Sequence, residues 1–304
     1  MFVKKQSVIA WVLVASAFGC GDSEASGASS GTAGSSSSSA AGAGGAGGSG
    51  SGGETGSGGT GGATPTEHFS FFVASLKAMQ ELSGSELGFG GDLRFGETGP
   101  GAGLRGADKI CAAIADMSMP GASGKEWRAF LSASDDGTGA QVDAIDRVGE
   151  GPWYDRLGRV VALTKEDLLS ERPANADPAI EEDLPNEDGV PNHTPDPTMP
   201  EVDNHHMLTG TNDEGRLFST SATCEDWTSS SSNVGPRVGL SWPREGGPGG
   251  PPPGGGSSRN WMSALDESGC APGVNLIQNG PGNDDGTVGS GGGYGGMYCF
   301  ALVP

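Results

Sequence analysis

The sequence predicts an α+β domain with long loops, which follows a segment that has no core of its own. The 57 glycines and 20 prolines make up about a quarter of the 304 residues, which argues against one compact helical domain. Apolar residues are 34% of the chain and can build one core if they are concentrated in part of it. After residue 68 most apolar stretches are short and separated by turn-rich loops. This pattern favours α+β over alternating βαβ units.

The first 19 residues have the pattern of a cleaved secretory signal. Lys4 and Lys5 form a short basic start, and residues 8–17 are an apolar run that only Ser16 interrupts. Because this run is too short to span a bilayer as a stable helix, it indicates an export signal rather than a membrane anchor.

The end of this segment is typical of a bacterial lipobox. Small residues at Ala17 and Gly19 precede Cys20, which in a lipobox becomes the lipidated first residue of the mature chain. An ordinary signal peptide with an incidental cysteine is the alternative. We expect lipidation of Cys20, export, and attachment to the membrane through the acyl chains. Gly21, rather than an aspartate, follows the cysteine and favours the outer membrane over the inner membrane.

Residues 20–66 are predicted to be a disordered linker after the lipidated cysteine. Of the 46 residues from Gly21 to Thr66, 42 are Gly, Ser, Ala or Thr, so almost no apolar surface can offset the entropy of folding. A flexible coil of this length spans roughly 35–40 Å on average. Such a tether would hold a folded domain clear of a membrane surface.

The folded domain is predicted to occupy residues 67–304. Aromatic and β-branched side chains at residues 69–76 predict a first strand. Residues 104–117 carry apolar side chains at helical spacing and end shortly before Pro120, which predicts an amphipathic helix. Further short apolar stretches predict strands at 127–131, 159–163, 207–210, 238–242 and 297–303.

Three segments between these elements are predicted to lack regular structure. Residues 171–204 carry ten acidic residues, seven prolines and a single basic residue. This acidic, proline-rich insertion is predicted to be exposed and poorly ordered. Residues 244–259 and 279–293 are rich in glycine and proline and are predicted to be loops.

The charge balance excludes one class of partner. Acidic residues outnumber basic residues by 38 to 17, for a net charge of −21. Phosphate backbones select clustered lysines and arginines, so we expect no nucleic acid partner.

Four cysteines remain once Cys20 is assigned to lipid. They are Cys111, Cys224, Cys270 and Cys299. An even number in an exported protein implies two disulfides, with three connectivities that the residues alone leave open. Because no CxxC pair is present, a zinc ribbon or a thioredoxin-like site is disfavoured.

Five segments resemble the endostatin domain of vertebrate collagens. Residues 103–111 (Gly-Leu-Arg-Gly-Ala-Asp-Lys-Ile-Cys) and 127–132 (Trp-Arg-Ala-Phe-Leu-Ser) are similar to its opening. Residues 208–216 (Leu-Thr-Gly-Thr-Asn-Asp-Glu-Gly-Arg) and 224–227 (Cys-Glu-Asp-Trp) are similar to its middle. Residues 297–300 (Met-Tyr-Cys-Phe) are similar to its end. The segments occur in the family's order and are spread over nearly the whole predicted domain.

The resemblance implies a C-type-lectin-like fold with nested disulfides, which would pair Cys111 with Cys299 and Cys224 with Cys270. Together with the lipobox, the domain also resembles the endostatin-like outer-membrane lipoproteins of spirochaetes, which are adhesins that bind extracellular-matrix and host serum proteins. Two family properties are not expected here. Heparin-type polyanions are not expected partners, because the chain has no basic cluster, and an N-terminal zinc site is not expected, because His68 has no neighbouring histidine.

Five residues in and beside the insertion form a candidate metal site. They are His193, Asp196, Asp203, His205 and His206. Their nitrogen and oxygen atoms could bind calcium or zinc. Their spacing matches no established ligand pattern, and a solvated acidic loop is the alternative. No other cofactor is predicted.

One tryptophan is a candidate for contact with a ligand. Trp153 lies in the run Gly-Pro-Trp-Tyr and is the tryptophan that we expect to be exposed, whereas the others are expected in the core. An exposed indole could stack on a sugar ring.

Two classes of function remain open. The first is a non-catalytic binding or adhesion module, anchored to the membrane, displayed at the surface or in the periplasm, with a protein or glycan ligand. The second is a metal-dependent carbohydrate-binding protein or hydrolase that uses the histidines of the insertion. Neither a Gly-x-Ser-x-Gly elbow nor a His-Glu-x-x-His motif is present, so the first class is preferred and no enzymatic activity is expected.

Overall fold

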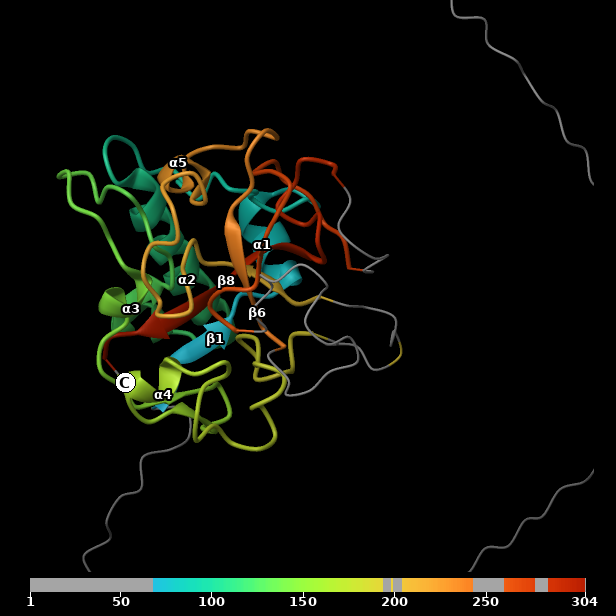
Figure 1. Ribbon diagram of the computed structural model, residues 1–304. Helices are drawn as coiled ribbons and strands as arrows, with labels where there is room; N and C mark the ends of the chain where they lie inside the picture. The colour runs from blue at the N-terminus through green and yellow to red at the C-terminus, as the bar shows by residue number, and fades with distance from the viewer. Residues whose placement is uncertain (1–67, 194–197, 199–203, 243–259, 277–283, 304) are drawn as a thin grey trace, which may run out of the picture. The chain divides into compact units, whose positions relative to one another are not determined.

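A computed structural model describes residues 68–193, 198, 204–242, 260–276 and 284–303 (Figure 1). These residues form a mixed α+β domain with two disulfides, as predicted. The predicted signal peptide (1–19), Cys20 and the rest of the predicted linker up to residue 66 lie outside the described residues, as does the predicted loop 244–259. In the described part of the chain, no helix is long and apolar enough to cross a membrane.

The centre of the domain is a six-stranded sheet around β8 (Gly293–Ala301). β8 pairs antiparallel with β1 (Phe71–Val73) and β2 (Trp127–Ala129), and parallel with β5 (His206–Leu208). Figure 1 shows β8 and β1 side by side in the middle of the domain. Every residue of β8 is buried, as expected of a strand that is covered on both faces.

Further strands extend this sheet or form a separate ribbon. β6 (Arg237–Leu240) pairs with β5, and β7 (Leu265–Asp266) pairs with β6. β3 (Trp153–Tyr154) and β4 (Val160–Ala162) make a two-stranded antiparallel ribbon. The five later strand predictions each contain or overlap an observed strand, namely β2, β4, β5, β6 and β8. The two-residue strands β3 and β7 are too short to produce a sequence period.

The predicted amphipathic helix is confirmed as α2 (Ala102–Ser118). Its apolar face packs on β2 and β8. Gly103 lies where the carbonyl groups of Asp226 and Trp227 pass so close that a Cβ atom would collide with them. The helix therefore needs a glycine at this position to approach the neighbouring backbone.

The predicted first strand is wrong at its end. α1 (Leu76–Ser83) begins where that strand was expected to finish. Ser75 is the N-cap, with an extended backbone and a hydroxyl that accepts a hydrogen bond from the first turn. Gly84 closes the helix in the left-handed conformation. The apolar character of residues 69–76 concealed these two helix signals.

Besides α1 and α2, the described part of the chain contains four short helical segments. They are η2 (Ala122–Lys125), α3 (Ala144–Arg147), α4 (Lys165–Leu168) and α5 (Cys224–Trp227). All four residues of α5 have positive φ, from 49° to 66°, so it is a left-handed turn. Such a conformation costs roughly 1–2 kcal/mol for each residue other than glycine. Contacts hold it in place, since Asp226 accepts hydrogen bonds from Ser134 and the Trp227 indole donates to the Ser132 carbonyl.

The two disulfides have the pairing that the resemblance implies. Cys111 on α2 bonds to Cys299 on β8, across a sequence separation of 188 residues. Cys224 in α5 bonds to Cys270, across 46 residues. The first disulfide fastens the long helix to the central strand, and the second fastens the left-handed turn.

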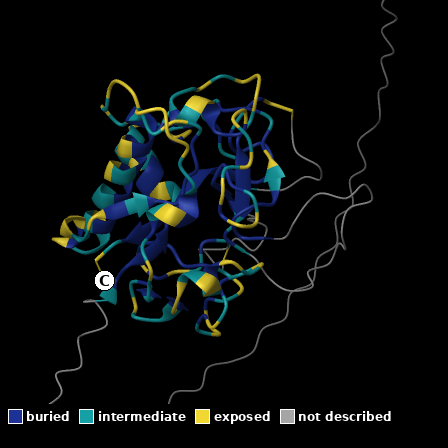
Figure 2. Cartoon of the chain, turned by 60° about the vertical axis from the view of Figure 1, so that its left-hand side comes forward, coloured by how far each residue is buried: buried dark blue, intermediate teal, exposed yellow. Residues whose placement is uncertain are grey.

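The acidic insertion is not an exposed excursion in its described part, which corrects the prediction. Ile180 and Leu184 are completely buried, and the backbone N–H of Leu184 donates to the Ser241 carbonyl at 2.8 Å. Figure 2 shows buried residues in the central strands and also in the irregular segments around them. The few apolar side chains of residues 171–193 join the core and hold the segment against the domain, whereas all its acidic residues except Glu187 keep some exposure to solvent.

Candidate binding cavity and histidine cluster

A cavity of about 660 Å³ lies between the start of α1, the end of α2 and the insertion. Its polar wall includes Ser75, Glu187, Asn192 and Asn204. Ser75 comes from the start of α1 and the other three from the insertion, and the end of α2 contributes Met117 and Ser118 to the lining.

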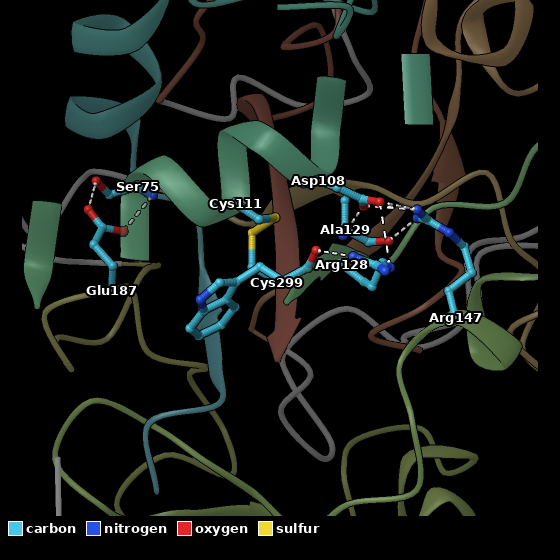
Figure 3. Close-up of a disulfide and its surroundings, with 9 residues drawn as sticks. Ser75, Asp108, Cys111, Arg128, Ala129, Arg147, Glu187 and Cys299 are labelled. Atoms are coloured by element: carbon cyan, nitrogen blue, oxygen red, sulfur yellow. Dashed lines mark hydrogen bonds and ion pairs between the residues drawn. A yellow bond between two sulfur atoms is a disulfide. The ribbon is translucent and has the colours of Figure 1, made fainter. Parts of the chain in front are cut away.

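Glu187 binds the start of α1. One of its carboxylate oxygens accepts a hydrogen bond from the Ser75 backbone N–H at 3.0 Å, and the other accepts one from the Ser75 hydroxyl at 2.5 Å (Figure 3). The Ser118 hydroxyl, at the end of α2, donates to the Glu187 carbonyl oxygen at 2.6 Å. These bonds fix the insertion to both helices.

The Glu187 carboxylate is buried without a counter-ion. The residue is 6% exposed, and it forms no ion pair with any described residue. Burial raises the pKa of the Glu187 carboxyl above its ordinary value, while the hydrogen bonds from Ser75 act in the opposite direction. The cavity wall therefore holds a carboxylate whose charge no described side chain balances.

Asn204 lines the same cavity and has a buried, unused acceptor. Asn204 is 3% exposed, and its side-chain amide nitrogen donates a hydrogen bond to the Asn192 backbone carbonyl at 3.1 Å. This bond fixes which end of the carboxamide is the nitrogen. The Asn204 Oδ1 atom is buried and has no hydrogen-bond partner in the described part of the chain. A buried acceptor without a partner is uncommon in folded proteins.

Asn192 is positioned by a hydrogen bond from the central sheet. The Tyr294 hydroxyl on β8 donates to the Ala74 carbonyl at 2.6 Å and lies 3.2 Å from Asn192 Oδ1. Burial raises the pKa of Tyr294 well above its ordinary value, so the phenol stays protonated. The polar wall is thus anchored to the central strand.

The remainder of the cavity is apolar or charged. Leu76, Met117, Val190 and Leu276 supply aliphatic surface, and Met117 is 42% exposed. Among the described lining residues, three are acidic and one is basic, namely Glu81, Glu187, Asp188 and Lys77. The lining therefore combines aliphatic surface with a net negative charge.

Three histidines of the predicted metal site gather beside this cavity. The His193 ring stacks on Trp242, with 3.8 Å between ring centroids and an 8° angle between planes. The His205 ring centroid lies 5.9 Å from that of His193 and 4.2 Å from that of His206. The fold therefore brings the three imidazoles into one cluster.

His206 is held by a buried carboxylate. Its Nδ1 lies 2.7 Å from Glu267 Oε1, and Glu267 Oε2 accepts hydrogen bonds from the Ser290 hydroxyl and the Gly291 N–H at 2.6 and 2.7 Å. His206 is 1% exposed, and its Nε2 has no hydrogen-bond partner among the described residues. A carboxylate that orients a histidine is common behind metal ligands.

The metal site remains a prediction. In the ranges that the structure describes, no group of three or more His, Cys, Asp or Glu side chains could hold a metal ion. Asp196 and Asp203 lie outside those ranges. The three histidines meet mainly through their rings and Trp242, and the carboxylate that contacts His206, Glu267, was not among the predicted ligands.

The expectation that Trp153 is exposed is wrong. It is 1% exposed and its ring meets Phe300 edge to face at 5.5 Å between centroids. Its indole is part of the core and presents no face to solvent. Pairing between β3 and β4 draws the aromatic side chain inward, which the surrounding glycine and proline did not indicate.

Sequence reasoning missed the residues of the cavity wall. Ser75 had a usable signal, because a serine before a run of helix-forming residues is typical of an N-cap. Glu187 had none, since nothing in the sequence separates it from the other acidic residues of the insertion. Asn204 likewise carries no local pattern.

Comparison with known proteins adds no assignment. No protein-family model matches the chain, and the search of curated proteins finds no significant match. Function therefore has to be inferred from the residues and the geometry.

Proposed function

We propose that this chain is an exported, lipid-anchored binding or adhesion module without catalytic activity. Cys20 carries the lipid, residues 20–66 form the tether, and a domain of endostatin-like, C-type-lectin-like fold binds a protein or glycan. Attachment is to the outer membrane, with the domain displayed at the surface or in the periplasm.

The cavity at α1, α2 and the insertion is the observation that carries this proposal. It is large, it combines aliphatic surface with hydrogen-bonding groups, and its polar wall is already ordered by bonds to the central sheet. Pockets with mostly apolar linings and a few placed polar groups are typical binding sites. The disulfide pairing is the one that the endostatin resemblance implies, and it supports the proposal of an endostatin-like fold.

Lipid anchoring is tested by expressing the full chain in a bacterial host with an alkyne-labelled fatty acid. We expect the wild-type chain to incorporate the label and to fractionate with the outer membrane. Cys20→Ala should abolish both, whereas Cys224→Ala should leave labelling unchanged. Labelling of Cys20→Ala at the wild-type level would contradict the proposal.

Binding is tested with the purified, oxidised full chain on arrays of extracellular-matrix proteins and glycans. Saturable binding of at least one partner, with that partner recovered chemically unchanged, is the expected result. A partner that is cleaved or modified on incubation would contradict a non-catalytic role.

A metal-dependent carbohydrate-binding protein or hydrolase is the second candidate. The observation in its favour is the cluster of His193, His205 and His206, together with the Nε2 of His206, which has no hydrogen-bond partner among the described residues. Metal analysis and melting with and without chelator decide between the two, because a metal that binds the native state raises its melting temperature. Stoichiometric zinc or calcium, lost in His206→Phe, would favour this second candidate.

A further inference from the structure

We propose that the cavity beside α1 binds a protonated primary amine on an alkyl chain, and that its source is a lysine side chain of a partner protein. This inference rests on the proposed binding function and names the ligand chemistry of the same cavity. Three features of the wall point to it: a carboxylate without a counter-ion and an acceptor without a donor among the described residues, and an aliphatic surface.

The first feature is the charge of Glu187. Its carboxylate is 6% exposed and already accepts two hydrogen bonds from Ser75, which leaves lone pairs on both oxygens. No described cation pairs with it. A buried carboxylate is strongly disfavoured unless a cation or further donors compensate its lost hydration. A bound ammonium group supplies both.

The second feature is the unused oxygen of Asn204. Because its amide nitrogen is committed to the Asn192 carbonyl, its Oδ1 can only accept a hydrogen bond. Any ligand group that satisfies it must be a donor. An ammonium group has three N–H donors and no acceptor, which is the chemistry that both the Asn204 Oδ1 atom and the Glu187 carboxylate can accept.

The third feature is the remaining lining. Leu76, Met117, Val190 and Leu276 provide aliphatic surface for a butyl stem, as lysine stems commonly pack on apolar surface. Glu81 and Asp188 add negative charge, and Lys77 is the single cation among the described lining residues, so an anionic ligand would meet net repulsion from them. The net charge of −21 likewise attracts cationic ligands and repels anionic ones over longer distances.

The test measures binding to the full chain by ligand-observed NMR at neutral pH and low salt. The probes are Nα-acetyl-lysine methylamide, the matching norleucine derivative that lacks the ammonium group, hexylamine, and the methyl glycoside of N-acetylglucosamine. We expect the lysine derivative to bind saturably and the norleucine derivative to bind at least ~10-fold more weakly. Tighter binding of hexylamine than of the lysine derivative would identify a free amine rather than a protein as the source. Binding of the glycoside alone would overturn the inference in favour of a glycan.

Variants locate the site. Glu187→Gln should weaken lysine binding at least ~10-fold. Glu214→Gln, which removes an exposed carboxylate outside the lining, should leave it unchanged. Near-ultraviolet circular dichroism checks that each variant is folded. Lys77→Gln is the variant least able to disturb the fold, because Lys77 is exposed and forms no ion pair in the described part of the chain. It should strengthen lysine binding ~2-fold or more, whereas unchanged or weaker binding would contradict a cationic ligand.

The outcomes separate this inference from the proposed function. One outcome is that array partners bind equally to wild-type and Glu187→Gln chains while the lysine derivative does not bind. That result would overturn the proposal of an amine ligand and leave the proposed binding function supported. If no partner and no probe binds, both are overturned.

Discussion

Two carboxylates lie on opposite sides of the Cys111–Cys299 disulfide, and the protein treats them differently (Figure 3). Asp108 on α2 meets Arg147 at 2.8 Å and Arg128 at 3.8 Å, and it accepts a hydrogen bond from the Ala129 backbone N–H. Glu187 receives hydrogen bonds from Ser75 but has no cation among the described residues.

The difference separates a carboxylate that is paired within the domain from one that lines a cavity and has no cation among the described residues. Burial raises the pKa of both groups, and at Asp108 the charge of Arg147 opposes this effect. Asp108 is therefore paired with arginines of the same domain. These contacts connect α2 with β2 and α3. Glu187 lines a cavity and forms no ion pair with a described residue. Four variants should break or sharpen this contrast.

The largest loss of stability is expected on removal of the Cys111–Cys299 disulfide, which lies between the two carboxylates. Cys111→Ala with Cys299→Ala should lower the free energy of unfolding by about 4–5 kcal/mol, because the bond joins residues 188 apart and restricts the unfolded chain. Removing the Cys224–Cys270 bond, which spans 46 residues, should cost about 1 kcal/mol less. Urea unfolding of the oxidised chains measures both losses. A larger loss for the shorter span would contradict the chain-entropy explanation.

The next effect comes from the paired carboxylate. Arg147→Met should destabilise the protein by about 3 kcal/mol at neutral pH, because it leaves Asp108 partly buried without its closest cation. Arg105→Met is the matched control, since Arg105 is about half exposed where it pairs with Glu97, and it should cost under about 1 kcal/mol. Similar losses for the two variants, measured by urea unfolding, would show that the Asp108 pair is no stronger than a surface pair.

A smaller effect is expected at the helix cap that Glu187 contacts. Ser75→Ala removes the N-cap of α1 and both contacts of its hydroxyl, and should cost about 1–2 kcal/mol. Thr164→Ala removes the N-cap of α4, where no buried carboxylate depends on the hydroxyl, and should cost about 1 kcal/mol. Thermal melts compare them. A greater loss for Thr164→Ala would argue against support of Glu187 by Ser75.

The smallest effect on stability is expected at the unpaired carboxylate. Glu187→Gln should change the free energy of unfolding by less than about 1 kcal/mol at pH 7, because no internal ion pair is lost. Its pH dependence has a definite sign. The folded pKa of Glu187 lies above the ordinary value of 4.5, so the wild type loses stability as the pH rises from that value through the folded pKa.

The glutamine variant lacks this loss, so its stability relative to wild type should increase between pH 4 and pH 7. Urea midpoints at the two pH values measure the difference. A relative stability that falls with rising pH would mean that the folded pKa of Glu187 is lowered, and that a cation compensates the carboxylate.

Much of the fold could be predicted because its signals are local. The helical spacing of apolar residues located α2, and short apolar stretches located five strands to within a few residues. The first strand was extended into α1 because an apolar run of eight residues fits both structures until its serine cap is recognised. The strand order β1-β8-β5-β6-β7 has no local signal, since pairing joins residues far apart in the chain.

The candidate site was only partly predictable. His193, His205 and His206 were singled out as metal candidates, and whether they converge was left open; their grouping with Trp242 and Glu267 depends on β5, β6 and the segment after β7 coming together. Trp153 was wrongly expected at the surface because its short strand is recognisable only from its partner.

The sequence by itself determined the α+β class, the long helix, the four cysteines of the domain and the acidic balance, because each depends on composition or on neighbours within a few residues. Only the tertiary structure decided that Ile180 and Leu184 draw the insertion into the core, and that Asp108 is paired while Glu187 has no cation among the described residues. The physical reason is that the cost of a buried charge is set by groups brought near it from distant parts of the chain, and these carboxylates look alike until the chain has folded.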